Sequence, residues 1–269
     1  MNTTQFEEKT LPTEPESSPV EDLDTASVAE VPPPRLLEVQ TRIPASLPSR
    51  LIHRNLLRSM VFSARKSLRI PIKIEGFERL DEIDAPFIIA PNHISLIDSA
   101  IMHIHLSRRH ANRTAVVGGL DFFAPREGAS ARENLWRRLV VRFIRGAVNV
   151  ALINRSGGDY SNLEQIDELL SKGWNLVIFP EATRSRTGKL GRMRLGVAEL
   201  AKRYGCPVMP AHISGTDGVL PVGGAFPRTG RITLRIGDPM AIGADEASRT
   251  FIERLGGRIE SLGTEERRG

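Results

Sequence analysis

The chain has 269 residues and a formal net charge of +5, a length that fits one large domain or two small ones. Its single cysteine, Cys206, excludes a framework of intramolecular disulfides and suits a reducing compartment. The sequence shows neither a signal-peptide pattern nor a run of about 18 apolar residues. We therefore expect a cytoplasmic protein that is soluble or attached peripherally to the cytoplasmic face of a membrane.

The first 34 residues differ in composition from the rest of the chain. They hold eight acidic residues, one lysine and six prolines, with almost no aromatic side chains. Such a segment buries too little apolar surface to fold, so we predict a disordered acidic tail and linker over residues 1–49. Because residues 1–34 carry a net charge of −7, residues 35–269 carry +12. The folded part should therefore bind an anionic partner.

Residues 50–70 are predicted to form a basic amphipathic helix. On a helical projection one side holds cations, namely Arg50, Arg54, Arg58, Arg65 and Arg69. The opposite side holds apolar residues, namely Ile52, Leu56 and Met60. The pattern is typical of a helix that lies on an anionic bilayer surface. It fits equally well a helix that packs on the domain and leaves a solvated basic face.

From residue 85 the sequence alternates short apolar runs with helical patterns, which predicts an α/β fold with a mixed sheet flanked by helices. We expect this domain to cover residues 71–269. Strands are expected at 86–91, 114–117, 148–153, 174–179, 206–213 and 231–236. Helices are expected at 97–107, 132–145, 160–172, 192–204 and 244–262. Gly173 provides a stop signal for the third of these helices.

The first candidate motif is Asn92-His93-Ile94-Ser95-Leu96-Ile97-Asp98. It follows an apolar strand, so His93 emerges at the carboxyl end of that strand, where ligands bind in open α/β sheets. Asp98 lies on the first turn of the next helix, from which it can hydrogen-bond one imidazole nitrogen and leave the other facing a substrate. A histidine held in this way can act as a general base near neutral pH. Taken alone, the spacing also fits a loop histidine and a helix-capping aspartate.

The second candidate motif is Phe179-Pro180-Glu181-Ala182-Thr183-Arg184-Ser185, which ends another strand. Five cations follow within eleven residues, namely Arg184, Arg186, Lys189, Arg192 and Arg194. Cations and free backbone amides at the start of a helix suit phosphate binding. Glu181 then needs an organising role, such as pairing with Arg184 or accepting a hydrogen bond from a substrate hydroxyl. The alternative is a solvated basic loop with a structural Glu-Arg pair.

Together the two motifs suggest acyl transfer to a phosphorylated alcohol. They resemble the motifs of the lysophosphatidic acid acyltransferases (1-acylglycerol-3-phosphate O-acyltransferases) and their glycerophospholipid acyltransferase relatives. That family carries Asn-His-x4-Asp followed by Phe-Pro-Glu-Gly-Thr-Arg-Ser, and this chain matches both in order and spacing. The resemblance runs from about residue 61 to residue 239.

The resemblance implies an αβ acyltransferase domain that uses acyl-CoA or acyl carrier protein as co-substrate, with no metal or other cofactor. It implies that His93 is the general base and Asp98 its partner. It also implies a group of acceptor-binding residues, namely Arg155, Glu181, Thr183, Arg184 and Lys189. The expected acceptor is a lysophospholipid, most simply 1-acylglycerol 3-phosphate, whose acylation gives phosphatidate. An anionic membrane surface is the expected further partner, and nucleic acid is not expected.

The chain departs from the family pattern at two places. Ala182 stands where the family has glycine, and its methyl group costs roughly 1 kcal/mol if this position requires a positive φ. In the family's middle block, which looks like Leu152-Ile153-Asn154-Arg155 here, the nearest preceding glycine is Gly146. That distance from Arg155 is longer than expected.

Other classes of function fit the sequence less well. A metallohydrolase is suggested by His103, His105 and His110, but two histidines two residues apart on a helix point in different directions. A non-catalytic module that binds membranes or nucleic acid would use the basic charge, yet it leaves His93 and Asp98 without a role. Cys206 could in principle accept an acyl group, although its place before Pro207 in an apolar run favours a buried structural thiol.

Overall fold

The computed structural model describes residues 46–84, 86–119, 130–153, 164–221 and 226–265. Within these residues the strands form one seven-stranded sheet in the order β1-β7-β6-β2-β5-β3-β4. Their bounds are β1 Ile72–Glu75, β2 Ile88–Pro91, β3 Thr114–Gly119, β4 Val150–Ile153, β5 Asn175–Val177, β6 Val208–Ser214 and β7 Ile232–Ile236. Strand β7 pairs antiparallel with β6 and parallel with β1, while the other pairs are parallel. The predicted mixed sheet is confirmed.

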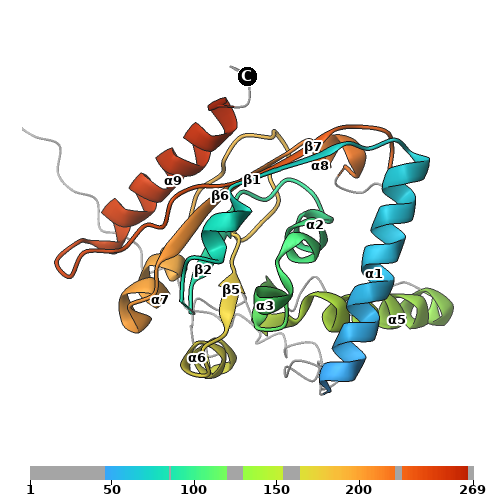
Figure 1. The fold of residues 1–269 in the computed structure, drawn as a ribbon, viewed down its shortest axis with the longest axis horizontal. Coiled ribbons are helices and arrows are strands. Elements are labelled where there is room, and N and C mark those ends of the chain that lie inside the picture. The colour runs from blue at the N-terminus through green and yellow to red at the C-terminus, as the bar shows by residue number, and fades with distance from the viewer. Residues whose placement is uncertain (1–45, 85, 120–129, 154–163, 222–225, 266–269) are drawn as a thin grey trace, which may run out of the picture. The chain divides into compact units, whose positions relative to one another are not determined.

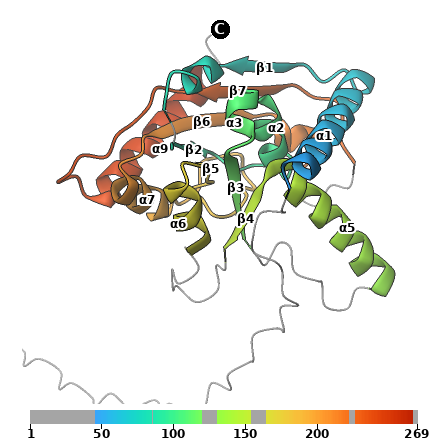
Figure 2. The ribbon, with the colours of Figure 1, turned by 60° about the horizontal axis from the view of Figure 1, so that its bottom comes forward.

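Helices cover both faces of this sheet (Figures 1 and 2). One face carries α1 (Leu47–Ser67), α2 (Asp98–His105), α3 (Arg108–Ala111) and α5 (Ala131–Val148). The other face carries α6 (Glu164–Ser171), α7 (Gly196–Tyr204) and α9 (Ser248–Glu265). The described residues also contain two further short helices, the 3-10 helix η1 (Phe77–Leu80) and α8 (Thr216–Val219).

The core is divided between the two faces by the alternation of side chains along each strand. On β2 and the residue before it, Phe87 and Ile89 belong to the cluster beneath α1 and α2. Ile88 and Ala90 belong to the cluster beneath α7 and α9. All four are fully buried, which explains why this strand appears in the sequence as an unbroken apolar run.

Most predicted elements are present with boundaries shifted by a few residues, and two differences have a clear physical reason. β1 was not predicted, because Ile72-Lys73-Ile74-Glu75 is a short alternating strand at the edge of the sheet. The helix expected at 192–204 begins at Gly196, since the backbone N–H of Arg194 donates to the carbonyl of Pro180 at 2.8 Å and holds this segment in a loop. Of the tail and linker predicted over residues 1–49, residues 1–45 lie outside the described residues, while residues 47–49 already belong to α1.

Helix α1 packs differently from a surface helix that buries its apolar side and leaves its whole basic side solvated, which is one of the two interpretations of this segment. Arg54 is 5% exposed and Leu57 is 9% exposed, so the helix packs on the domain at these positions, while Arg58, Arg65 and Arg69 on the basic side are exposed. Positions 54, 57 and 61 fall on one helical stripe, and Leu57 and Val61 pack against the core. This packing draws the Arg54 stem inward. The apolar residues Ile52, Leu56 and Met60 are 61%, 52% and 61% exposed instead.

Candidate functional site

Three segments that are distant in the sequence meet at one edge of the sheet. Strand β2 lies between β6 and β5 and runs parallel to both, so all three strands end at the same edge. His93 follows β2, Glu181 follows β5, and Thr216 begins α8 directly after β6. This is the place where open α/β sheets bind their ligands.

His93 and Asp98 form the hydrogen bond that the first motif predicts. The Nδ1 atom of His93 lies 2.8 Å from Oδ2 of Asp98. Asp98 is fully buried, whereas the His93 side chain is 18% exposed. The pair therefore has a buried carboxylate and an imidazole that reaches the surface of the site.

Asp98 accepts three further hydrogen bonds, which fix its role as an acceptor. Its Oδ2 accepts the backbone N–H groups of Ile94 and Ser95, both at 2.8 Å. Its Oδ1 accepts the hydroxyl of Thr216 at 2.5 Å. A carboxylate surrounded by donors requires the His93 Nδ1 to carry a proton. The Nε2 atom of the neutral ring is then the proton acceptor that the site presents.

The His93 ring is also held by packing. It stacks on Phe179 of the second motif, with ring centroids 4.0 Å apart and an interplanar angle of 27°. The turn itself is tied to β6, because the Asn92 side chain exchanges two hydrogen bonds with the backbone of Ile213, at 2.9 and 2.7 Å. Ser95 Oγ donates to the carbonyl of Leu220 at 2.6 Å. The candidate base is thus fixed from several neighbouring segments.

Among the described residues, Glu181 forms no ion pair with a cation. Its Oε1 accepts the backbone N–H of His93 and its Oε2 accepts the backbone N–H of Gly191, both at 2.8 Å. The side chain is 5% exposed. The observed role differs from the two examples expected for Glu181, since its carboxylate joins the first motif to the segment after the second motif through backbone amides.

The candidate acceptor-binding residues fall into two groups. Thr183, Arg184 and Lys189 lie in the loop that follows Glu181, where Arg184 is half-buried and the other two are exposed. The loop is joined to the first motif, since the backbone N–H of Ser185 donates to the carbonyl of His93 at 2.7 Å. Arg155 lies outside the described residues. The structure thus joins the loop that carries Arg184 and Lys189 to the backbone of His93.

Ala182 has a φ of 57°, which is the left-handed region that favours glycine. Its backbone N–H closes a turn by donating to the carbonyl of Phe179 at 3.0 Å. The conditional expectation for this position is confirmed, because the loop does require a positive φ.

The histidines behind the metallohydrolase alternative serve the core of the domain. His103 is fully buried, and burial, followed by the charge of Arg54, lowers its pKa to about 3. His105 Nδ1 lies 2.7 Å from the carbonyl of Ile101, and His110 pairs with Asp81 at 3.1 Å. Among the residues that the structure describes, no three His, Cys, Asp or Glu side chains are grouped to hold a metal ion.

Cys206 is buried, and burial raises the pKa of its thiol to about 11. A thiol with such a pKa is a poor nucleophile at neutral pH. A structural thiol is therefore the interpretation that its surroundings favour.

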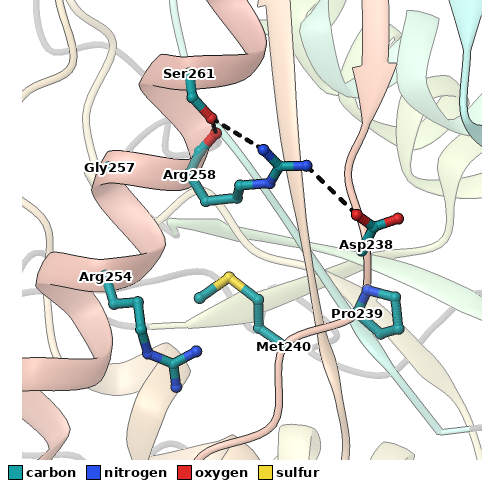
Figure 3. A pocket seen from close by; sticks show the side chains of 7 residues that line it. All are labelled: Asp238, Pro239, Met240, Arg254, Gly257, Arg258 and Ser261. Carbon is teal, nitrogen blue, oxygen red and sulfur yellow. Dashed lines mark hydrogen bonds and ion pairs between the residues drawn. The ribbon is translucent and has the colours of Figure 1, made fainter.

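A pocket away from these residues lies between α9 and the segment after β7 (Figure 3). It is lined by Asp238, Pro239, Met240, Arg254, Gly257, Arg258 and Ser261. Met240 pairs with Val208, the first residue of β6, so the pocket is at the opposite end of that strand from Thr216. Its arginines are engaged, Arg258 with Asp238 at 3.4 Å and Arg254 with Glu246 at 2.9 Å.

Comparison with known proteins places the two motifs in a family. The sequence pattern of the Acyltransferase family matches residues 71–214, which includes His93, Asp98 and the second motif. The chain belongs to the acyltransferase family. Its acyltransferase region ends at the last residue of β6, so Thr216 lies just beyond the matched residues.

Curated relatives share part of this acyltransferase sequence. The chain is 30% identical over 154 residues to a chloroplastic 1-acyl-sn-glycerol-3-phosphate acyltransferase of Arabidopsis thaliana, covering 56% of this chain and 38% of that protein. It is 27% identical over 153 residues to the corresponding Brassica napus protein, covering 56% and 39%. The aligned part spans about two fifths of the length of these relatives.

A solved structure shares the fold of the acyltransferase. The crystal structure of the 1-acyl-sn-glycerophosphate (LPA) acyltransferase from Thermotoga maritima matches with a TM-score of 0.56 and 22% sequence identity. The match covers 80% of this chain and 81% of that chain. It supports the fold class that the alternation of strands and helices predicts.

Three residues of the site were not singled out from the sequence. Thr216 follows Gly215, and no motif marks it, although its place just after a predicted strand was a usable signal. Phe179 was recognised as part of the second motif, but its stacking on the His93 ring was not predicted. Gly191 was overlooked because a glycine within a basic loop has many structural explanations.

Proposed function

We propose that this acyltransferase moves a fatty acyl group from acyl-CoA or acyl carrier protein to the free hydroxyl of 1-acylglycerol 3-phosphate, which gives phosphatidate. The observation that supports this most is the His93–Asp98 hydrogen bond next to the cationic loop of the second motif. The names of the curated relatives support the same acceptor.

In the proposed reaction, Nε2 of His93 takes the proton of the acceptor hydroxyl while the oxygen attacks the thioester carbonyl carbon. Asp98 stabilises the imidazolium that forms, because its buried carboxylate is hydrogen-bonded to Nδ1. The carbon–sulfur bond then breaks, and the imidazolium returns its proton to the departing thiolate. The acyl group passes directly between substrates, without an acyl-enzyme.

The acceptor phosphate is proposed to bind Arg184 and Lys189, with Thr183 close by. Arginine suits this role because its planar guanidinium can donate two parallel hydrogen bonds to a phosphate. Arg155 is proposed as a further phosphate ligand on the resemblance alone. No cofactor beyond the acyl donor is proposed.

The direct test is to incubate purified protein with labelled acyl-CoA or acyl carrier protein and a panel of acceptors. The panel would contain 1-acylglycerol 3-phosphate, glycerol 3-phosphate, a lysophosphatidylcholine and a phosphate-free monoacylglycerol. We expect labelled phosphatidate from the first acceptor, and the two donors compared side by side identify the thioester used. A protein that acylates only another acceptor would overturn the proposed substrate, and one that acylates none would overturn the reaction.

The proposed enzyme also binds an anionic membrane surface, with α1 and α5 as the contact. No helix in the part of the chain that the structure describes is long and apolar enough to cross a membrane. The two helices pack together and expose apolar side chains, 62% for Phe62, 57% for Leu135 and 53% for Leu139. Exposed arginines flank these on α5, namely Arg132, Arg138 and Arg142. Apolar and basic side chains together suit insertion among anionic headgroups.

This surface can be tested with vesicles of phosphatidylglycerol and phosphatidylcholine. Replacing Leu56 and Leu139 together by glutamate should release most of the protein from the vesicles at low salt. The matched control is Ile74→Glu, which changes another exposed apolar residue, on the edge strand β1, and should leave binding unchanged. Equal binding by both variants would remove this face from membrane contact.

A further inference from the structure

Glu181 is enclosed between two backbone segments that belong to different parts of the site. One carboxylate oxygen accepts the N–H of His93 and the other accepts the N–H of Gly191, each at 2.8 Å. With 5% of the residue exposed, the carboxylate is largely shielded from solvent. Its hydrogen bonds link the candidate base to the segment that carries Lys189, Arg192 and Arg194.

The contact with Gly191 leaves no room for a side chain. A Cβ atom built on Gly191 would lie 2.8 Å from Oε2 of Glu181 and 3.7 Å from its Cδ. Real Cβ atoms essentially never approach another heavy atom that closely. The glycine therefore lets the backbone approach the carboxylate directly, and the two positions depend on each other.

The main chain of His93 is held at both of its polar groups by the second motif. Its N–H donates to Glu181, and its carbonyl accepts the N–H of Ser185 at 2.7 Å. The imidazole is held separately, by Asp98 and by stacking on Phe179. The ring can therefore occupy its place only while the loop containing Glu181 keeps the backbone in position.

We propose that Glu181 is a positioning residue, which holds the backbone of His93 at a fixed separation from the cationic loop, and that it does not bind the acceptor. This rests on the proposed function, in which His93 is the base and the loop binds phosphate. The family resemblance implies acceptor binding for this glutamate instead. The two roles make different kinetic predictions, because a ligand to the acceptor acts on binding and a positioning residue acts on turnover.

The most informative substitution is Glu181→Gln, since it keeps the size of the side chain. A glutamine presents one oxygen and one NH2 group, so one of the two backbone N–H groups would face another donor. A buried donor without an acceptor is costly, and the side chain or the turn must shift to relieve it. Gly191→Ala disturbs the same contact from the other side, because its methyl group must displace the carboxylate.

Both variants should lower kcat by roughly 10-fold to 100-fold, the size of effect that a small misplacement of a reacting group produces. The KM for 1-acylglycerol 3-phosphate should change by less than about three-fold, because acceptor binding is not removed. A phosphate-free acceptor should show the same loss. The matched control is Gly196→Ala, which adds the same methyl group where no heavy atom lies within 4 Å, and its kcat should be unchanged.

A second measurement needs no substrate. In protein labelled with ¹⁵N-histidine, the imidazole signals of His93, assigned with His93→Ala, should move in both Glu181→Gln and Gly191→Ala and stay in place in Gly196→Ala. If Glu181→Gln fails to fold, Gly191→Ala carries the comparison. Failure of wild-type protein to transfer any acyl group would reject the proposed function, while the imidazole signals would still decide whether Glu181 positions His93.

Two results would overturn the positioning role. An increase in KM with unchanged kcat and unmoved imidazole signals would make Glu181 a ligand of the acceptor. A lower melting temperature with unchanged kcat and unmoved signals would make it a residue of the fold alone.

Discussion

Two buried charges in this protein have opposite surroundings. Asp98, at the carboxyl edge of the sheet, is fully buried and accepts hydrogen bonds from His93, Thr216 and two backbone amides. Arg54, beneath α1, is 5% exposed and donates to Asn112 Oδ1 at 2.7 Å. Among the described residues it has no carboxylate within ion-pair distance. Burial, and then the neighbouring arginines, lower its pKa.

The surroundings of Asp98 serve the proposed reaction, whereas those of Arg54 affect the stability of the fold. A buried carboxylate with a full set of donors is inexpensive to keep and holds an imidazole in one place. A buried cation with a neutral partner costs free energy, which the apolar contacts of Leu57 and Val61 must offset. Substitutions around Asp98 should therefore change turnover, whereas those around Arg54 should change stability and its dependence on pH.

The largest effect is expected at His93. Because the ring is the proposed general base, His93→Ala should lower kcat by at least about 100-fold while the protein stays folded. The measurement is steady-state acyl transfer together with a thermal melt. His105→Ala removes a ring from α2, away from the proposed chemistry, and should retain turnover in the folded protein. Near-normal turnover in folded His93→Ala would remove this residue from the mechanism.

The second effect is a loss of folding stability at acidic pH, caused by His103, whose pKa is lowered by burial and by Arg54. His103 is fully buried, and burial together with Arg54 and Arg58 lowers its pKa from 6.5 to about 3, against a smaller opposite effect of the backbone of Thr114 and Ala111. The unfolded state therefore binds more protons than the folded state between these values. This contribution to stability is lost progressively as the pH falls below about 6.5, and down to about 3.

Between pH 7 and pH 5 this amounts to roughly 2 kcal/mol in the free energy of unfolding. Urea unfolding of wild type and of His103→Leu at both pH values measures it. The variant should lose about 2 kcal/mol less than wild type on acidification, whatever its stability at pH 7. Equal losses would show that His103 can be protonated in the folded state.

The sequence predicted one side of this comparison better than the other. The hydrogen bond between His93 and Asp98 followed from a local spacing, since both lie on one strand-to-helix turn. The place of Glu181 near them followed from each motif ending a strand, although its bonds to backbone amides did not. Every residue except proline has a backbone N–H, so residue types do not show which of these groups a carboxylate will bind. The role of Glu181 was therefore taken from the family resemblance, which implies acceptor binding.

The side of α1 that faces the domain was left open by the sequence for a related reason. Its arginines and its apolar residues lie on opposite sides, and burial of the apolar side is the usual outcome for a surface helix. The choice depended on tertiary packing, because Leu57 and Val61 lie among the arginines and contact the core. An extended arginine stem can bury its methylene groups, so residue charge alone did not reveal which side faces inward.

The third effect, at Thr216, is smaller. Thr216→Val keeps the shape of the side chain but removes the hydroxyl that donates to Oδ1 of Asp98. The carboxylate keeps its bonds on Oδ2, so we expect kcat to fall by about 10-fold, the effect of one lost hydrogen bond to a charged group. Thr216→Ser keeps the hydroxyl and should restore most of the turnover. Equal kinetics for Val and Ser would show that the hydroxyl is not needed to hold Asp98.

The smallest effect is expected at Ala182, where a substitution by glycine should stabilise the protein. Its φ of 57° costs an L residue roughly 1–2 kcal/mol, which glycine avoids. Glycine also makes the unfolded chain more flexible, at a cost of about 0.4–1 kcal/mol. Ala182→Gly should therefore stabilise the protein by somewhat less than about 1 kcal/mol and raise the melting temperature by roughly 1–4 °C.

Ala64→Gly, inside α1, provides the control, because glycine in a helix should lower stability by about 1 kcal/mol. A lower melting temperature for Ala182→Gly would show that the strain at this turn is too small to outweigh the flexibility that glycine adds.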